Sequence, residues 1–420
     1  MNKNERKVPR RIAQTILNSL KGGVVPRIGL PYIAVGRKNE IEALLHDVDI
    51  IAEGGASFRF IVGRYGSGKS FLIQTIRNYV MDRGFIVADA DLSPERRLQG
   101  SRGQGLATYR ELISNLSTKT RPEGGALTLV LDRWISGVQS EAVRETGLTP
   151  GDAALTQAVD QKIYAVTSAI SEMVHGFEFA RLLSRYYHAY LEGDDETKAK
   201  VVRWFRGEYA LKREAKEELG VNILITDDDW YDYLKLFAVF FRHAGYAGMM
   251  IMIDELVNLY KIPNAITRQY NYEKPQAIED RRRGIYSYEA LRSRLAEGKF
   301  SKPGSRDLLA PVIHLEPLQP EEMLVLCEKL ADMHGGLYGY TRKLSTTDLA
   351  RFIKLEYGRI GADQHITPRE VIRDFIELLD LLYQDPARTM DDLLDSEDFA
   401  YARSEAVSDE ADQAFAEFTI

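Results

Sequence analysis

Apolar side chains recur with helical spacing along most of this chain, and the strand-forming runs between the helical segments are short. These runs occupy residues 58–62, 85–92, 249–253 and 312–315. The second run is apolar almost up to its acidic end, which is typical of a parallel strand buried on both faces. Because helical segments separate the runs, the pattern predicts an α/β fold with a parallel sheet.

The longest stretch without strand character extends from about residue 101 to residue 247 and is dense in helical patterns. We assign it to a large helical insertion, and we expect its tryptophans and tyrosines to lie in the core rather than on a base-stacking surface. Three consecutive aspartates, Asp227 to Asp229, follow Thr226 and precede an apolar periodic run. They are interpreted as a charged first helical turn rather than as a metal cluster.

Two helices are expected before the first strand. Apolar positions between residues 12 and 20 share one helical face, and Gly22-Gly23 marks the end of that helix. A second amphipathic helix is expected from about Glu40 to Ala52, followed by a stop at Gly54-Gly55.

A small helical bundle is expected after the last strand. Its first helix should extend from about Glu321 to Met333 and end at Gly335-Gly336, and another should lie near residues 345–357. The last helix opens at Thr367-Pro368-Arg369-Glu370, which combines a capping residue, a proline at the first helical position and a glutamate at the third.

The first strand leads directly into a phosphate-binding motif. Residues 63–70 read Gly-Arg-Tyr-Gly-Ser-Gly-Lys-Ser, the complete G-x-x-x-x-G-K-S pattern, and a helical run follows. Glycines let the backbone curl so that N–H groups point at phosphate oxygens, while the helix dipole also faces the anion. We expect the nucleotide to be bound by Gly63, Tyr65, Gly66, Ser67, Gly68, Lys69, Ser70 and Phe71.

Within this motif, Lys69 should reach the β- and γ-phosphates, and the Ser70 hydroxyl should ligate Mg²⁺. The third strand supplies the second half of the site, because its apolar run ends in Asp254-Glu255. Asp254 is expected to hold the Mg²⁺ hydration shell, and Glu255 is expected to accept a proton from the attacking water. An adjacent Asp-Glu pair is typical of nucleotide hydrolases, and the chain lacks the N-K-x-D guanine motif, which favours ATP.

Two other functions stay open from the residues alone. Asp89 and Asp91 end the second strand, where carboxylates of a small-molecule kinase would handle the acceptor, although caps and turns after a core strand explain them equally well. Glu255 argues against the kinase. The protein could also be a slow nucleotide-gated switch or scaffold in which ATP mainly builds a complex.

Charge and composition bear on the possible partners of the chain and on its cellular compartment. The chain carries a net charge of −7, yet residues 391–420 hold ten acidic side chains against Arg403, so the remainder is close to neutral. The basic start, with Lys3, Arg6 and Lys7 among its residues, could touch DNA phosphates. No apolar run approaches the ~20 residues that span a membrane, and no secretory signal is recognised. The single cysteine, Cys327, excludes an internal disulfide and fits a reducing cytoplasm. The seven histidines show no metal-binding spacing.

The order of a Val-Gly-Arg turn, a helix and a phosphate loop resembles the AAA+ ATPases of the origin-recognition type. The resemblance implies that residues 33–37, including Val35, line an adenine pocket. It also implies that Arg294, ahead of Arg292, is an arginine finger acting on a neighbouring subunit, and hence a homo-oligomer. Arg369 becomes the candidate second sensor that touches the γ-phosphate. A solvated helix face and an ordinary surface arginine remain the alternatives for these arginines.

The whole set of motifs resembles the ATP-binding proteins of bacterial BREX-type phage-exclusion islands over roughly residues 10–385. The motifs are Gly22 to Leu30, Val35 to Arg37, Gly63 to Ser70, Met252 to Glu255, Arg281 to Tyr288 and Thr367 to Glu370. This resemblance implies a Mg²⁺-dependent ATPase in anti-phage defence, with partners such as double-stranded DNA or a helicase.

The expected architecture is an AAA+ P-loop core with a parallel sheet, a large helical insertion and a C-terminal helical lid. We divide it into a basic arm and helix (1–30), the core (31–100 and 248–318), the insertion (101–247), the lid (319–385) and an acidic tail (386–420). Two features depart from the AAA+ pattern. No strand with a first sensor is found between Ile262 and Arg281, so either the sensor is lost or a stretch is missing between about Tyr272 and Ile278. A terminal DNA-reading domain is doubtful as well.

Overall fold

The computed structural model describes residues 8–64, 66–100, 102–149, 151–256, 258, 308, 310–341, 344–358 and 367–395. The chain divides into two compact units. The first, which we call the loop–lid unit, comprises residues 1–41, 61–75 and 314–420. The second, which we call the insertion unit, comprises residues 42–60 and 76–313.

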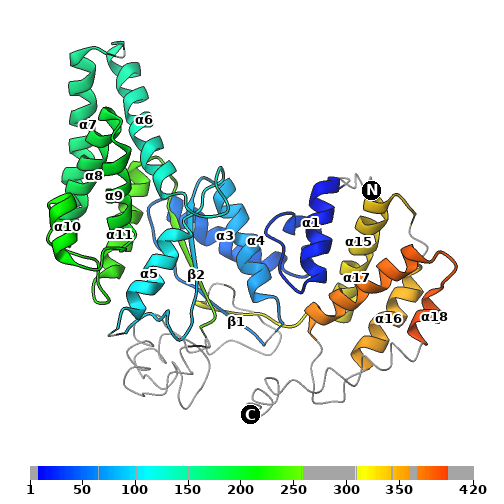
Figure 1. Cartoon of the computed structure of the whole chain (residues 1–420). Coiled ribbons are helices and arrows are strands. Elements are labelled where there is room, and N and C mark those ends of the chain that lie inside the picture. Colours follow the sequence, from blue (N-terminus) through cyan, green and yellow to red (C-terminus); the bar gives the residue numbers. More distant parts are fainter. Residues whose placement is uncertain are drawn as a thin grey trace. The chain divides into compact units, whose positions relative to one another are not determined.

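The helices of the loop–lid unit share one apolar core (Figure 1). They are α1 (Arg10–Lys21), α2 (Leu30–Ile33), α15 (Pro320–Tyr338), α16 (Thr346–Gly358), α17 (Pro368–Gln384) and α18 (Met390–Leu394). Phe352 and Phe375 meet in this core with ring centroids 5.3 Å apart, and Ile16 and Met323 are completely buried there. The core therefore joins the N-terminal helix to the C-terminal bundle, and α1 ends at Gly22 as the glycine pair predicted.

Helix α15 differs from the prediction at its C-terminus. The helix was expected to stop at Gly335-Gly336, but it continues through both glycines to Tyr338 and ends at Gly339, which has a φ of 78°. Gly335 is buried, and Leu337 beyond it belongs to the apolar core. Packing of this last turn therefore outweighs the low helix propensity of two glycines.

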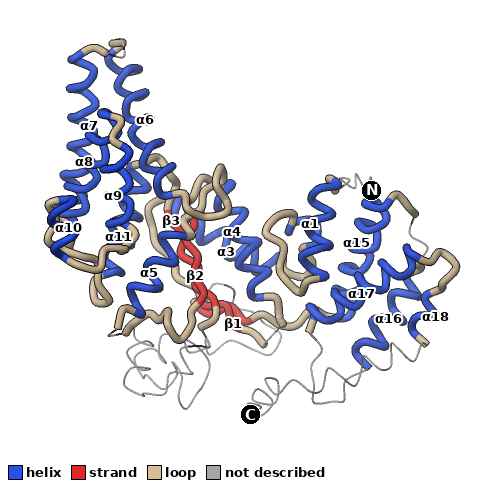
Figure 2. The backbone as a smooth tube through the Cα atoms, in the orientation of Figure 1, coloured by secondary structure: helices blue, strands red, loops and turns tan. Residues whose placement is uncertain are grey.

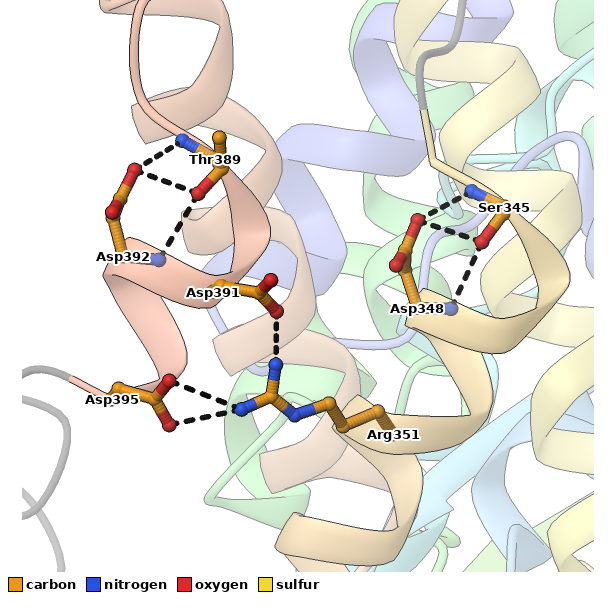
Figure 3. A network of polar contacts seen from close by, with 7 residues as sticks. All are labelled: Ser345, Asp348, Arg351, Thr389, Asp391, Asp392 and Asp395. Atoms are coloured by element: carbon orange, nitrogen blue, oxygen red, sulfur yellow. Dashed lines mark hydrogen bonds and ion pairs between the residues drawn. The ribbon is translucent and has the colours of Figure 1, made fainter.

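Ion pairs connect α18 to α16 (Figure 3). The Arg351 guanidinium on α16 binds the Asp391 carboxylate and lies 2.9 Å from Asp395 Oδ1, so it joins α16 to both ends of α18. Helix α18 begins with a capping box, in which Thr389 and Asp392 satisfy each other's backbone N–H groups. The contacts join the short α18 to the bundle.

Four strands are present among the described residues, and they form two pairs (Figure 2). Strand β1 (Phe60–Val62) pairs with β4 (Val312–His314), and β2 (Ile86–Asp91) pairs in parallel with β3 (Met249–Asp254). Helices α3 (Lys38–Ala52) and α4 (Lys69–Asp82) precede and follow β1. The structure is thus a helix-rich α/β fold with small parallel sheets, as the alternation of elements predicted.

Strand β3 is less buried than its partner β2, although its sequence is more apolar. All its residues are partly accessible, and the Ile251 side chain is 40% exposed. Among the described residues β3 pairs only with β2, whereas β2 itself is buried at four of its six positions. An apolar run therefore identified the strand correctly but did not fix its burial.

The insertion unit is dominated by helices, as predicted. They are α5 (Gln104–Ser114), α6 (Leu127–Thr146), α7 (Ala153–Ser171), α8 (Gly176–Glu192), α9 (Asp195–Phe205), α10 (Lys212–Leu219) and α11 (Trp230–His243). Their core is aromatic: Phe179 packs against Phe205 and Phe237, and Trp204 packs against Tyr233. All five side chains are buried, so the core interpretation of these aromatic residues is confirmed.

The three aspartates, expected in a first helical turn, lie directly before α11 instead, and two of them accept hydrogen bonds from N–H groups near the starts of helices. The Asp229 carboxylate accepts from the Thr226 N–H at 2.6 Å, within the turn that starts α11. Asp227 instead accepts from the Gly103 and Leu106 N–H groups at 2.7 and 2.8 Å, at the N-terminus of α5. This second cap satisfies N–H groups that have no intrahelical partner, and it ties two distant segments together.

In the part of the chain that the structure describes, every helix is too short or too polar to cross a bilayer.

Candidate functional site

The loop that carries the G-x-x-x-x-G-K-S motif, which we call the phosphate loop after its sequence, lies between β1 and α4, as the strand–loop–helix order predicted. Gly66 and Gly68 have φ values of 75° and 90°, a region that glycine enters without steric cost. At Gly63 a Cβ would lie 2.5 Å from Ser67 Oγ and 2.7 Å from the Leu315 carbonyl oxygen. Helix α4 begins immediately afterwards, because the Leu72 N–H donates to the Gly68 carbonyl at 2.9 Å. The glycines of the motif are therefore required by the backbone itself.

Lys69 lies in the first turn of α4, and its ammonium group lies against the loop. The Nζ atom donates to the Gly63 carbonyl at 2.6 Å and to the Arg64 carbonyl at 3.0 Å. Ser70 follows and is exposed. The loop thus combines a positive charge, a helix N-terminus and an exposed serine, which suits a polyphosphate. Tyr65 of the same motif lies outside the described residues.

The start of α17 contacts the tip of this loop. A Cβ at Gly66 would lie 2.6 Å from Thr367 Cβ, and Thr367 is the N-cap residue of α17. The capping box is present as predicted, since Thr367 accepts from the Glu370 N–H while the Glu370 carboxylate accepts from the Thr367 N–H. Arg369 is therefore in the first turn of a helix whose cap touches the loop, and its Cδ lies 3.6 Å from a Cβ position at Gly23.

Two further expected nucleotide contacts occupy one region of the loop–lid unit. Val35 and Phe71 are partly buried and pack against the apolar core of α1, α2 and the C-terminal helices. Phe71 also belongs to the first turn of α4, where its carbonyl accepts from Thr75 Oγ1. An apolar surface beside a phosphate loop is the environment that a base would occupy.

The acidic end of β3 forms a separate group in the insertion unit. Asp254 is in register with Asp91 of β2, and the Leu92 N–H donates to the Asp254 carbonyl at 3.1 Å. Partial burial raises the pKa of the Asp91 carboxyl, and the negative charges of Asp254 and Asp89 raise it further. The parallel strands therefore concentrate carboxylates at their C-terminal ends, where ligands of α/β sheets bind.

Glu255 has an unusual backbone conformation. Its φ is 58°, a left-handed value that costs a non-glycine residue of the order of 1–2 kcal/mol. The Asp254 carboxylate accepts from the Glu255 N–H at 2.8 Å, and the Glu255 carbonyl accepts from the Asn258 N–H at 3.0 Å. Such strain clusters at functional sites, and here it falls on Glu255, an exposed residue directly after β3.

Sequence reasoning missed two residues around these groups. Asn258 donates to the Leu92 carbonyl at 2.8 Å and so ties the segment after β3 to the end of β2. Arg77, which is buried, donates to Asp89 at 3.2 Å and to Ser117 Oγ at 2.6 Å. Of these two, only Asn258 offered a local signal, because it lies close behind Asp254-Glu255, whereas Arg77 binds Ser117 40 residues away. Arg37, which the resemblance placed at an adenine pocket, is buried and donates to the loop at the Ser67 carbonyl.

Several expected site residues lie outside the described residues. These are Arg292 and Arg294, the two finger candidates, and the Arg281 to Arg283 run. Among the described residues, no group of three or more histidine, cysteine, aspartate or glutamate side chains is arranged to hold a metal. Magnesium at a nucleotide site does not require such a group, because phosphate oxygens and water supply most of its ligands.

Comparison with known proteins identifies the family. The sequence model of the BREX system ATP-binding protein BrxC/D matches residues 8–275 and 274–398. The two matched stretches meet inside the interval in which the sequence lacks the expected sensor strand. Searches of curated proteins and of solved structures each gave no match. Because the family model covers most of the chain, the resemblance noted in the sequence is confirmed, and the chain belongs to the family of BREX system ATP-binding proteins BrxC/D.

Proposed function

We propose that the chain is a Mg²⁺-dependent ATPase of AAA+ type that acts in anti-phage defence. The observation that carries the proposal is the phosphate loop, with its glycines at positive φ and Lys69 folded against the loop backbone at the N-terminus of α4. Membership of an ATP-binding BREX family supports ATP as the ligand. In this proposal ATP binding and hydrolysis are coupled to assembly on DNA or on a partner protein.

The loop–lid unit would bind the nucleotide. Lys69 and the N–H groups of the loop would neutralise the phosphates, while Val35 and Phe71 would contact the base. Arg369, in the first turn of α17, would add positive charge near the γ-phosphate. Contact between Thr367 and Gly66 supports this last assignment, because it holds the start of α17 at the loop.

Hydrolysis would require the acidic pair after β3. Ser70 and Asp254 offer hydroxyl and carboxylate oxygens, the hard donors that Mg²⁺ prefers. The metal would neutralise phosphate charge, and Glu255 would accept a proton from the attacking water. The strained backbone at Glu255 supports a fixed direction for that carboxylate. Arg294 from a neighbouring subunit would make turnover depend on a homo-oligomer, with a contribution of about 10³–10⁵ in rate.

Substitution Glu255→Gln tests the catalytic assignment. The variant should bind ATP as the wild type does and should lose phosphate release, measured as inorganic phosphate per chain under excess ATP and Mg²⁺. Glu196→Gln is the matched control, since Glu196 is exposed on α9 and pairs only with Lys200 in the described contacts. Undiminished turnover in Glu255→Gln would contradict the assignment.

Assembly is tested on the wild-type chain. Turnover per chain should rise with protein concentration and with added double-stranded DNA, and light scattering should show a larger mass when ATP is present. ATP-dependent assembly with negligible turnover would instead make the protein a nucleotide-gated switch. Adding a helicase of the same defence system would show whether such a partner is recruited.

A further inference from the structure

The Gly36-Arg37 turn, between α2 and α3, contacts both the phosphate loop and the segment that leads into the C-terminal helices. One Arg37 nitrogen, Nη2, donates to the Ser67 carbonyl at 2.8 Å and to the Glu316 carbonyl at 2.7 Å. Arg37 is only 4% exposed, and its other terminal nitrogen lies 3.6 Å from Glu40, which is 1% exposed. The guanidinium is therefore a buried, charge-balanced bridge between segments far apart in the sequence.

The bond to Ser67 sets the direction of a phosphate-binding amide. All described peptide bonds are trans, and in a planar trans peptide the C=O and the N–H point in opposite directions. Holding the Ser67 carbonyl toward Arg37 thus aims the Gly68 N–H to the opposite side. The guanidinium also lies 3.9 Å from a Cβ position at Gly68, so it packs beside the residue directly before Lys69.

The same turn contacts the segment between β4 and α15 at both of its ends. Glu316 follows β4 and accepts from Arg37, while a Cβ at Gly36 would clash with the Glu322 carboxylate. Glu322 is the third residue of α15 and closes its capping box with Gln319. The connection from the last strand to the C-terminal helices is therefore held by the residues that hold the loop.

We propose that Arg37 is a positioning residue that orients the Gly68 amide toward the nucleotide phosphates and couples the loop to the β4–α15 connection. The proposal rests on ATP binding at the phosphate loop, as proposed above. It assigns to Arg37 an action through the backbone at Ser67 rather than a contact with the nucleotide. Lysine at this position would keep the charge beside Glu40, but its single ammonium lacks the planar fork that reaches both carbonyls and Glu40.

The test measures the affinity of the full chain for a fluorescent ATP analogue in Arg37→Lys, together with the melting temperature. Arg185→Lys is the matched control, because Arg185 also donates to two backbone carbonyls, those of Leu219 and Glu218, within the insertion unit. We expect Arg37→Lys to weaken ATP binding at least tenfold and Arg185→Lys to leave it unchanged, even where both variants melt at lower temperatures.

The double variant Arg37→Gln/Glu40→Gln removes both buried charges together, so that neither is left unpaired. It should show the same loss of affinity. Wild-type affinity in either folded variant would overturn the proposal, and so would failure of both variants to fold, because Arg37 would then be needed for folding alone. Lys69→Ala tests ATP binding at the phosphate loop separately from the role of Arg37. If the wild type does not bind ATP, or if Lys69→Ala still binds it tightly, the proposed nucleotide site itself is wrong.

Discussion

Asp91 and Asp254 are register partners at the C-terminal ends of the parallel strands β2 and β3. The two carboxylates repel each other, and Asp89 lies two residues before Asp91 on the same strand. Partial burial and these neighbouring charges raise the pKa of the Asp91 carboxyl. Without a ligand, the carboxylates at the acidic end of β3 therefore repel one another. Such perturbed groups are common at sites that bind a cation or catalyse a reaction.

The first prediction concerns Asp91→Asn. A carboxyl whose pKa is raised on folding binds more protons in the folded state, so its contribution to stability falls as pH rises above about 3.9. The variant should remove this loss and stabilise the protein at pH 7 by about 0.2–1 kcal/mol. The gain is small because Asp91 is only partly buried, so that solvent still screens its charge. Thermal denaturation of the variant and of the wild type at pH 5 and pH 7 measures this difference in stability.

Asp89→Asn is the comparison for that measurement. It lies on the same strand but accepts from the buried Arg77, so it should destabilise the protein by about 1–3 kcal/mol. If the two variants changed the melting temperature in the same direction, the opposite electrostatic roles of Asp89 and Asp91 would be wrong.

A second prediction follows from the left-handed backbone at Glu255. Glycine adopts a φ of 58° without steric cost, so Glu255→Gly should raise the free energy of unfolding by about 1 kcal/mol. Glu255→Gln keeps the strain and should leave stability unchanged. Both variants should lose phosphate release, if Glu255 has the proposed role. Equal melting temperatures for the glycine and glutamine variants would show that the backbone at Glu255 is not strained.

The sequence predicted those parts of the molecule that depend on neighbouring residues. The glycines of the phosphate loop, the stop of α1 at Gly22 and the capping box at Thr367 all depend on residues within one or two turns. Motif spacing also located Asp254 at the end of a strand. These features follow from local backbone chemistry, and a single sequence carries that information.

Features that depend on distant residues could not be predicted. Arg37 meets carbonyls 30 and 279 residues away, and Asp227 caps a helix more than 120 residues before it. No periodicity encodes which remote carbonyl or N–H a polar side chain will reach. The same reason explains α15, where burial of Gly335 against other helices outweighed the local stop signal.

The third prediction is a loss of stability on acidification through His334. This side chain is 1% exposed, with Nε2 at 3.1 Å from Asp380 and Nδ1 at 2.7 Å from the Tyr340 hydroxyl. Burial lowers the pKa of the imidazole, although Asp380 opposes that effect. As the pH drops below about 6.5, the unfolded chain takes up a proton at His334 that the folded protein does not bind. The free energy of unfolding therefore falls as the pH drops below about 6.5.

Asp380 extends this loss to lower pH. Burial opposes ionisation of the carboxyl, but hydrogen bonds from Lys21 and His334 outweigh it and lower the pKa of Asp380. Its stabilising contribution should therefore disappear only below the ordinary pKa of about 3.9. Melting temperatures between pH 8 and pH 5 should depend less on pH in His334→Gln than in the wild type. His188→Gln, at an exposed histidine of α8, should keep the wild-type slope.

The last prediction uses the glycines at the end of α15. Gly336 is exposed inside the helix, and a Cβ there would meet no atom within 4 Å. Alanine lowers the entropy of the unfolded chain and has a higher helix propensity, so Gly336→Ala should stabilise the protein by about 0.5–1 kcal/mol. Gly339 has equally open surroundings but a φ of 78°, so Gly339→Ala should destabilise the protein by about 1 kcal/mol. Urea denaturation of the two variants distinguishes them, because only backbone conformation separates the sites. Destabilisation by Gly336→Ala would mean that α15 ends at Gly335-Gly336 in solution, as its sequence first indicated.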